Sequence, residues 1–104
     1  EAIHVLENAS IHHPNETAIL LSLASSYHGA GQTIKAEKIT NEVLIIDASD
    51  LLARYDRACY LAQLNRNEEA KEELEFVLRE DESGFFAELI EDDENLAALR
   101  EFEK

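Results

Sequence analysis

Apolar side chains recur along the chain at helical spacing, in stretches separated by short polar turns. Ala2, Leu6 and Ala9 fall at i, i+4 and i+7, which predicts a helix from about Glu1 to Ile11. Pro14 ends it, because the residue before a proline is pushed out of the helical region. The same reading predicts further helices over 16–29, 33–46, 50–64 and 68–80, then a short helix from 85, a break near the acidic run 91–94 and a last helix.

The turns between these stretches carry residues that start and stop helices. Asn15 and Ser49 are good N-caps for the helices that follow them. Gly29 and Gly31 supply the positive φ angles that a helix stop and a short turn require. Because every connection is short, we expect successive helices to pack antiparallel.

The stretch from Thr17 to Gly84 is one 34-residue unit written twice. Ala24 recurs as Ala58 and Ala36 recurs as Ala70. Three more pairs keep the same spacing: Val43 and Val77, Leu44 and Leu78, and Asp47 and Asp81. A period of this length is typical of stacked-repeat proteins, in which one unit buries its apolar face only against a neighbour.

Composition narrows the class of partner. The 104 residues suit one domain, and 45% are hydrophobic, so the chain is not a disordered tail. The net charge is −14, from 23 acidic and 9 basic side chains, which argues against nucleic acid and anionic membranes as partners and favours a basic one. The alternative is that the charge only solvates the outer helix faces.

Other sequence features bear on the origin of the chain. One cysteine, Cys59, excludes an intrachain disulfide, so a cytoplasmic location is favoured while the compartment stays open. The longest strongly apolar stretch, 18–21, is far too short to span a bilayer. The chain contains no methionine and its first residues already read as mid-helix, so we expect it to be part of a longer protein.

The repeated unit resembles the tetratricopeptide repeat, whose pattern is W-x2-L-G-x2-Y…A-x3-F…P. The first copy reads Leu20-x2-Leu23-Ala24-x2-Tyr27…Ala36-x3-Thr40…Ala48, and the second reads Arg54-x2-Arg57-Ala58-x2-Leu61…Ala70-x3-Leu74…Glu82. The tryptophan is absent from both copies, and arginines stand at two apolar positions of the second. The resemblance implies an all-α fold, a superhelical stack of antiparallel helix pairs. It divides the chain into the second helix of a preceding repeat (1–14), two repeats (15–48 and 49–82) and C-terminal capping helices (83–104).

Proteins of this family bind extended or helical peptides in a concave groove lined by the first helix of each pair. Carried over position by position, the resemblance implies ten groove residues, which are Ala18, Leu21, Ser22, Ser25, His28, Leu52, Tyr55, Asp56, Cys59 and Gln63. Some members grip a terminal carboxylate with basic or amide side chains, but those positions here hold Leu21, Ser25, Tyr55 and Cys59. We therefore expect an amphipathic segment with some basic residues. The alternative is a groove that is solvated or filled by the chain's own C-terminal segment.

Candidate chemistry elsewhere in the sequence is weak. Adjacent histidines such as His12 and His13 point in different directions, so we expect no metal site. Ser25, His28 and Asp56 have the residue types of a hydrolytic triad, but serine and histidine at this spacing are common by chance. No glycine-rich phosphate loop is present. We expect neither a cofactor nor catalysis.

The sequence thus predicts a non-catalytic scaffold that binds a protein or peptide. Two alternatives remain open. The chain is a structural extension of a longer solenoid, with self-association possible, or it is a non-catalytic appendage of a larger enzyme.

Overall fold

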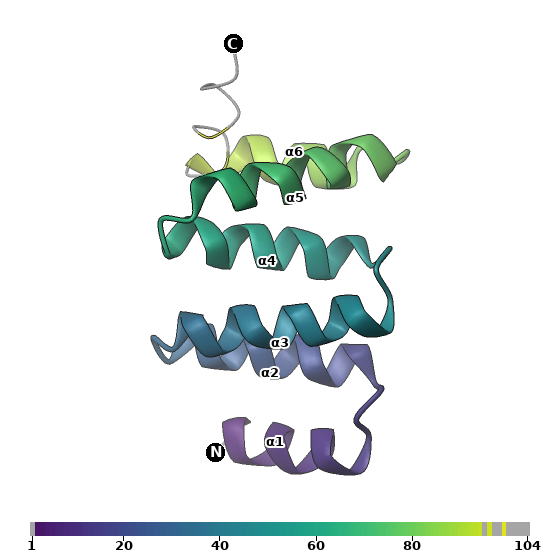
Figure 1. The fold of residues 1–104 in the computed structure, drawn as a ribbon, viewed down its shortest axis with the longest axis vertical. Coiled ribbons are helices and arrows are strands. Elements are labelled where there is room, and N and C mark those ends of the chain that lie inside the picture. Colours follow the sequence, from purple (N-terminus) through teal and green to yellow (C-terminus); the bar gives the residue numbers. More distant parts are fainter. Residues whose placement is uncertain (1, 95, 97–98, 100–104) are drawn as a thin grey trace.

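Six α-helices run through the part of the chain that the computed structural model describes, which is residues 2–94, 96 and 99 (Figure 1). Each helix packs on the next, and consecutive helices run in opposite directions. No strand occurs in this part of the chain, so the predicted all-α stack is confirmed. In chain order the helices are α1 (Ala2–His12), α2 (Thr17–Gly29), α3 (Thr33–Ile46), α4 (Leu51–Gln63), α5 (Asn67–Glu80) and α6 (Phe85–Asp92).

The 34-residue period of the sequence is also the period of the structure. Helices α2 and α4 each have 13 residues, and α3 and α5 each have 14. Helix α4 begins at Leu51, 34 residues after Thr17, and α6 begins at Phe85, a further 34 residues on. The two helical hairpins therefore match residue for residue, and α6 starts where a third would start.

The turns within the hairpins repeat as well. Gly31 has a φ of 82° and Asn65, the matching residue of the second hairpin, has a φ of 62°. Glycine and asparagine are the residues that tolerate this left-handed conformation, which reverses the chain at the helix end. The prediction of a positive φ is confirmed for Gly31 and is wrong for Gly29, which lies inside α2.

The N-caps predicted at Asn15 and Ser49 are each one residue early. Helix α2 is preceded by Glu16 rather than Asn15, and α4 is capped by Asp50 rather than Ser49. The backbone N–H of Ala53 donates to the Asp50 carboxylate at 3.0 Å. Ser49 instead donates its hydroxyl to Asp47 Oδ1 at 2.7 Å. Its side chain therefore stabilises the turn before α4 and does not cap the helix.

The recurring alanines lie in the cores of the two hairpins. Ala24, Ala36, Ala58 and Ala70 are each 0% exposed. A larger side chain at these positions would hold the paired helices apart, which explains why the residue type returns at a fixed interval.

Two apolar clusters form the core. The first lies between α2 and α3 and includes Leu20, Leu23 and Val43. The second lies between α4 and α5 and takes in Ile90 from α6, together with Leu96 and Leu99 that follow it. The residues after α5 therefore cover the end of the second hairpin.

The expected closing segment, 83–104, is described only in part. Leu96 and Leu99 are helical and buried. Phe102, which the apolar spacing placed on the same face, lies outside the described residues, and so does Glu1 at the expected start of the first helix.

The two arginines that depart from the repeat pattern join three helices through ion pairs. Arg57 of α4 pairs with Glu37 of α3 at 3.1 Å and with Glu73 of α5 at 2.7 Å. Arg54 pairs with Glu73 at 2.7 Å, and Arg66 reaches Glu37 at 3.3 Å. Both glutamates are only 4% exposed. The second hairpin thus uses a partly buried ionic network at the positions where the first uses Leu20 and Leu23.

Candidate functional site

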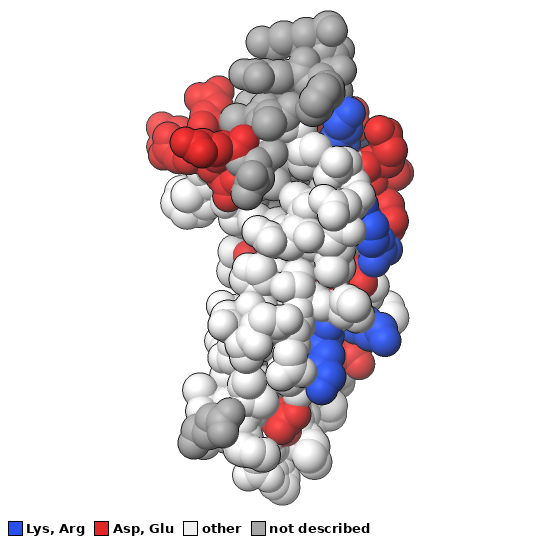
Figure 2. All heavy atoms as spheres, turned by 90° about the vertical axis from the view of Figure 1, so that its left-hand side faces the viewer, with Lys and Arg blue, Asp and Glu red and all other residues white. Residues whose placement is uncertain are grey.

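The side of the stack formed by α2, α4 and α6 is hollowed. Figure 2 views the molecule from the left of Figure 1, and its left outline recedes below a projecting group of acidic side chains. Lys and Arg side chains gather along the opposite edge. Helices α2 and α6 contain neither residue, and the two arginines of α4 are held in the ion pairs with α3 and α5.

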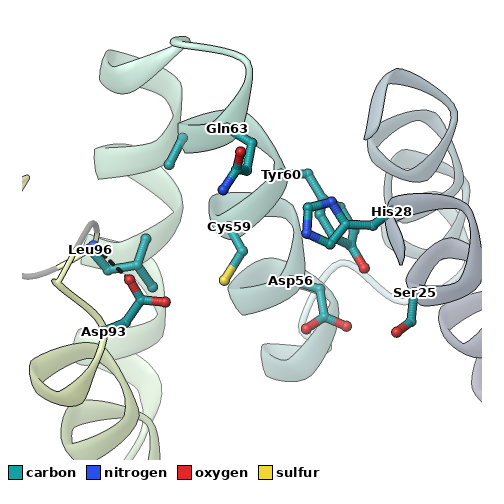
Figure 3. A pocket seen from close by; sticks show the side chains of 9 residues that line it. Ser25, His28, Asp56, Cys59, Tyr60, Gln63, Asp93 and Leu96 are labelled. Carbon is teal, nitrogen blue, oxygen red and sulfur yellow. Dashed lines mark hydrogen bonds between the residues drawn. The ribbon is translucent and has the colours of Figure 1, made fainter. Parts of the chain in front are cut away.

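A cleft of about 300 Å³ opens between α2, α4 and the segment that follows α6 (Figure 3). Helix α2 lies on one side of the cleft, Asp93 and Leu96 lie on the other side, and α4 lies between them. Five of the ten predicted groove residues line it together with four others. The lining residues are Ser25, His28, Asp56, Cys59, Tyr60, Ala62, Gln63, Asp93 and Leu96.

The other five predicted groove residues lie outside the cleft. Ala18 and Ser22 are exposed on α2, and Leu52 is 47% exposed on α4. Tyr55 packs its ring against Phe86 of α6, with the ring centroids 5.6 Å apart. Leu21 does not offer a free side chain, because it is 8% exposed and belongs to the first core cluster.

Several of the predicted groove side chains make contacts within the chain. Besides Leu21 and Tyr55, Cys59 packs against both core clusters and His28 contacts its own and the neighbouring helix pair. The C-terminal segment reaches the second half of the groove through Phe86 and Asp93. The chain's own C-terminal segment therefore occupies part of the groove beside α4, as the alternative interpretation expects. It does not cover the part beside α2.

His28 is held in a fixed orientation. Its Nδ1 atom lies 3.0 Å from the hydroxyl oxygen of Thr33, and its ring packs against Tyr60 with the centroids 5.0 Å apart. A hydrolytic triad requires the histidine to be bonded to the nucleophile and to the acid. In the described structure the ring is bonded to Thr33 rather than to Ser25 or Asp56, so these three residues lie together without forming a triad.

Asp56 is the charged group of α4 in the cleft. Its carboxylate is half-buried and makes no hydrogen bond or ion pair within the described residues. Burial, and secondly the negative charge of Asp50, raise its pKa from 3.8 to about 6. The ionised Asp56 carboxylate therefore lowers the free energy of unfolding.

The other polar groups of the cleft are either neutral or hydrogen-bonded within the chain. Burial, with the nearby Asp93 as a smaller cause, raises the pKa of the Cys59 thiol to about 12, which keeps it protonated and a poor nucleophile at neutral pH. Burial also raises the pKa of the Tyr60 phenol, so it stays neutral. The carboxylate of Asp93 accepts a hydrogen bond from the backbone N–H of Leu96 at 3.2 Å.

Tyr60, Ala62, Asp93 and Leu96 were not among the predicted site residues. Tyr60 follows Asp56 by four positions on α4 and so lies on nearly the same helix face. Asp93 and Leu96 stand 34 residues after Cys59 and Ala62. Applying the 34-residue period once more to α4 would therefore have placed Asp93 and Leu96 at the groove.

The histidines noted in the sequence do not come together. Among the described residues, no group of three or more His, Cys, Asp or Glu side chains is arranged to hold a metal ion. None of the described helices combines the length and the apolar content that crossing a membrane requires.

No protein-family model matches the chain, and no curated protein sequence matches it either. The resemblance to the tetratricopeptide repeat therefore rests only on the chain's own residues, which are the recurring alanines and their spacing.

Proposed function

We propose that this chain is a tetratricopeptide-like scaffold that binds a segment of another protein on its hollowed α2–α4 side. The observation that carries the proposal is the cleft of about 300 Å³, because side chains from three separate parts of the chain converge on it. Clefts that accept ligand groups start at about this size. Stacked helical repeats use the extended surface of their first helices in this way.

The chemistry of the site supports binding rather than catalysis. His28 is bonded to Thr33, and the Cys59 thiol is protonated at neutral pH. Neither arrangement pairs a nucleophile with a base that would activate it. The lining side chains instead supply hydrogen-bonding groups, apolar contacts and one unpaired carboxylate, a mixture that suits a peptide.

The charge distribution supports a partner with basic residues. The chain carries a net charge of −14, and the hollowed side has no Lys or Arg from α2 or α6. A field of this sign attracts a basic segment and raises its rate of association.

A peptide selection tests the proposal. A random peptide library is panned against the immobilised chain, and the recovered peptides are measured against two variants by fluorescence anisotropy. Each variant replaces an exposed small side chain by arginine: Ser22→Arg on the hollowed side and Ala30→Arg in the turn after α2. We expect Ser22→Arg to weaken binding at least tenfold and Ala30→Arg to leave it unchanged. Equal affinities for both variants, or the recovery of no peptide, would refute the proposal.

A specific observation favours the alternative of a structural extension or self-association. Helix α1 has no buried side chain, and its Val5 and Ile11 are 66% and 74% exposed. Apolar surface of this kind is typical of a helix that packs on a further element. Sedimentation velocity over a range of concentrations distinguishes the two functions, because self-association through α1 would disappear in Val5→Ser/Ile11→Ser while peptide binding would not change.

A further inference from the structure

The cleft holds a carboxylate with no counter-charge among its lining residues. Asp56 makes no hydrogen bond or ion pair within the described residues, and the nine residues that line the cleft include neither lysine nor arginine. The described arginines of α4 are both engaged with glutamates on the other side of the helix. A partly buried charge without a partner is unusual, because burial favours either pairing or neutralisation.

The other walls of the cleft suit the stem of a long basic side chain. Ala62, Leu96 and the ring of Tyr60 line the same cleft and are apolar. Lysine and arginine pack their methylene groups on such surface while the charged end stays with polar groups. The Ser25 hydroxyl and the Gln63 side-chain carbonyl also line the cleft and can accept N–H groups.

The size of the cleft also limits its occupant. At about 300 Å³ it lies at the lower end of the range for clefts that hold whole small molecules. A single side chain projecting from a bound segment can enter such a volume, whereas a folded element cannot.

We propose that this cleft is a subsite for one lysine or arginine side chain of the bound segment, with Asp56 as its ionic partner. The inference rests on the proposed function and adds to it the residue type that the partner must present and the position that recognises it. The raised pKa of Asp56 is in keeping with this role, because a bound cation would remove the penalty that burial imposes on the carboxylate.

The test uses small amides in place of the unknown partner. Nα-acetyl-arginine N-methylamide, the lysine equivalent and the citrulline equivalent are titrated into the ¹⁵N-labelled chain, and the backbone amide signals are followed by NMR. Citrulline has the shape of arginine without its charge. We expect the arginine and lysine amides to shift the signals of Ser25, His28, Asp56 and Gln63, with citrulline at least tenfold weaker.

Two carboxylate-to-amide variants separate local pairing from the general negative field. Asp56→Asn removes the proposed partner, and Asp92→Asn removes an exposed carboxylate at the end of α6 that does not line the cleft. We expect Asp56→Asn to weaken the arginine amide at least tenfold and Asp92→Asn to change it less than threefold. Equal effects of the two variants, equal binding of citrulline, or shifts confined to other surfaces would overturn the proposal.

The outcomes also separate this inference from the proposed function. Library peptides that respond to Ser22→Arg but not to Asp56→Asn would leave the scaffold function standing and refute the subsite. Arginine amide that binds at the cleft while the library yields no peptide would refute the scaffold function, and the cleft would then be a site for free cations rather than for a partner's side chain.

Discussion

Replacing Asp56 by asparagine should make the protein more stable, and only above about pH 4. Burial raises the pKa of this carboxyl from 3.8 in the unfolded chain to about 6 in the fold. Because the folded state holds the proton more tightly, stability falls as pH rises from about 4 to 6 and stays lower above that range. Asparagine has nearly the same shape and carries no charge, so it removes the penalty.

The size of the effect follows from the pKa change. Going from 3.8 to about 6 is a rise of about 2, and each unit corresponds to about 1.4 kcal/mol, so the upper bound is about 3 kcal/mol at neutral pH. Water reaches the half-buried carboxylate through the open cleft and screens it, which reduces the expected gain to about 1–2 kcal/mol. For a domain of this size the melting temperature should rise by about 5–10 °C.

Thermal unfolding followed by circular dichroism at pH 7.5 and at pH 4 measures this effect. Asp92→Asn is the control, because it removes one exposed charge and reports the general relief of repulsion in a chain of net charge −14. We expect Asp56→Asn to exceed the control at pH 7.5 and to equal it at pH 4. A gain of the same size at both values of pH, or no gain over the control, would refute the reasoning that Asp56 is an unpaired and partly buried charge. A gain that disappears when a basic peptide is bound would further connect the cost to function.

Three further predictions concern the fold. Ala58→Leu should lower the free energy of unfolding by about 1–3 kcal/mol, because Ala58 is 0% exposed and the larger side chain overpacks the second hairpin; an unchanged melting temperature would contradict this register. Arg57→Ala should cost about 1–3 kcal/mol in urea unfolding, because the buried Glu37 and Glu73 each lose one ion pair and keep another, to Arg66 and Arg54; an unchanged free energy of unfolding would show that the network adds little. Gly31→Ala should cost about 1–2 kcal/mol because Gly31 has a φ of 82°, whereas Gly29→Ala, inside α2, should be neutral or stabilising by up to about 1 kcal/mol; equal effects in thermal melts would contradict the turn geometry.

The periodic parts of the fold were predictable from the sequence because they depend on local spacing. The observed helices α2, α3, α4 and α5 begin and end within one residue of the predicted bounds. The alanines at 24, 36, 58 and 70 are buried as their recurrence indicates. Cap positions were less predictable, since Ser49 and Asp50 are both good caps and only the turn decides which side chain is free.

The candidate site was predictable only as far as it follows the repeat. Ser25, His28, Asp56, Cys59 and Gln63 meet at one cleft because the 34-residue period places them on matching helix faces. Leu21 was assigned to the same groove, but it lies in the core because neighbouring helices cover that part of α2. Register along a helix gives the direction of a side chain, and only packing decides what lies in that direction.

The sequence by itself determined the repeat, the helix pairs and the excess of negative charge, because each depends on residue type and spacing along the chain. Only the tertiary structure decided that Arg54 and Arg57 pair with Glu37 and Glu73, and that Asp93 and Leu96 close a cleft around Asp56. The ion pairs join residues 16 to 20 positions apart, and the cleft is lined by residues as distant in sequence as Asp56 and Leu96, which are 40 positions apart. The existence of the ion pairs and the cleft depends on how the helices stack, which no local pattern encodes.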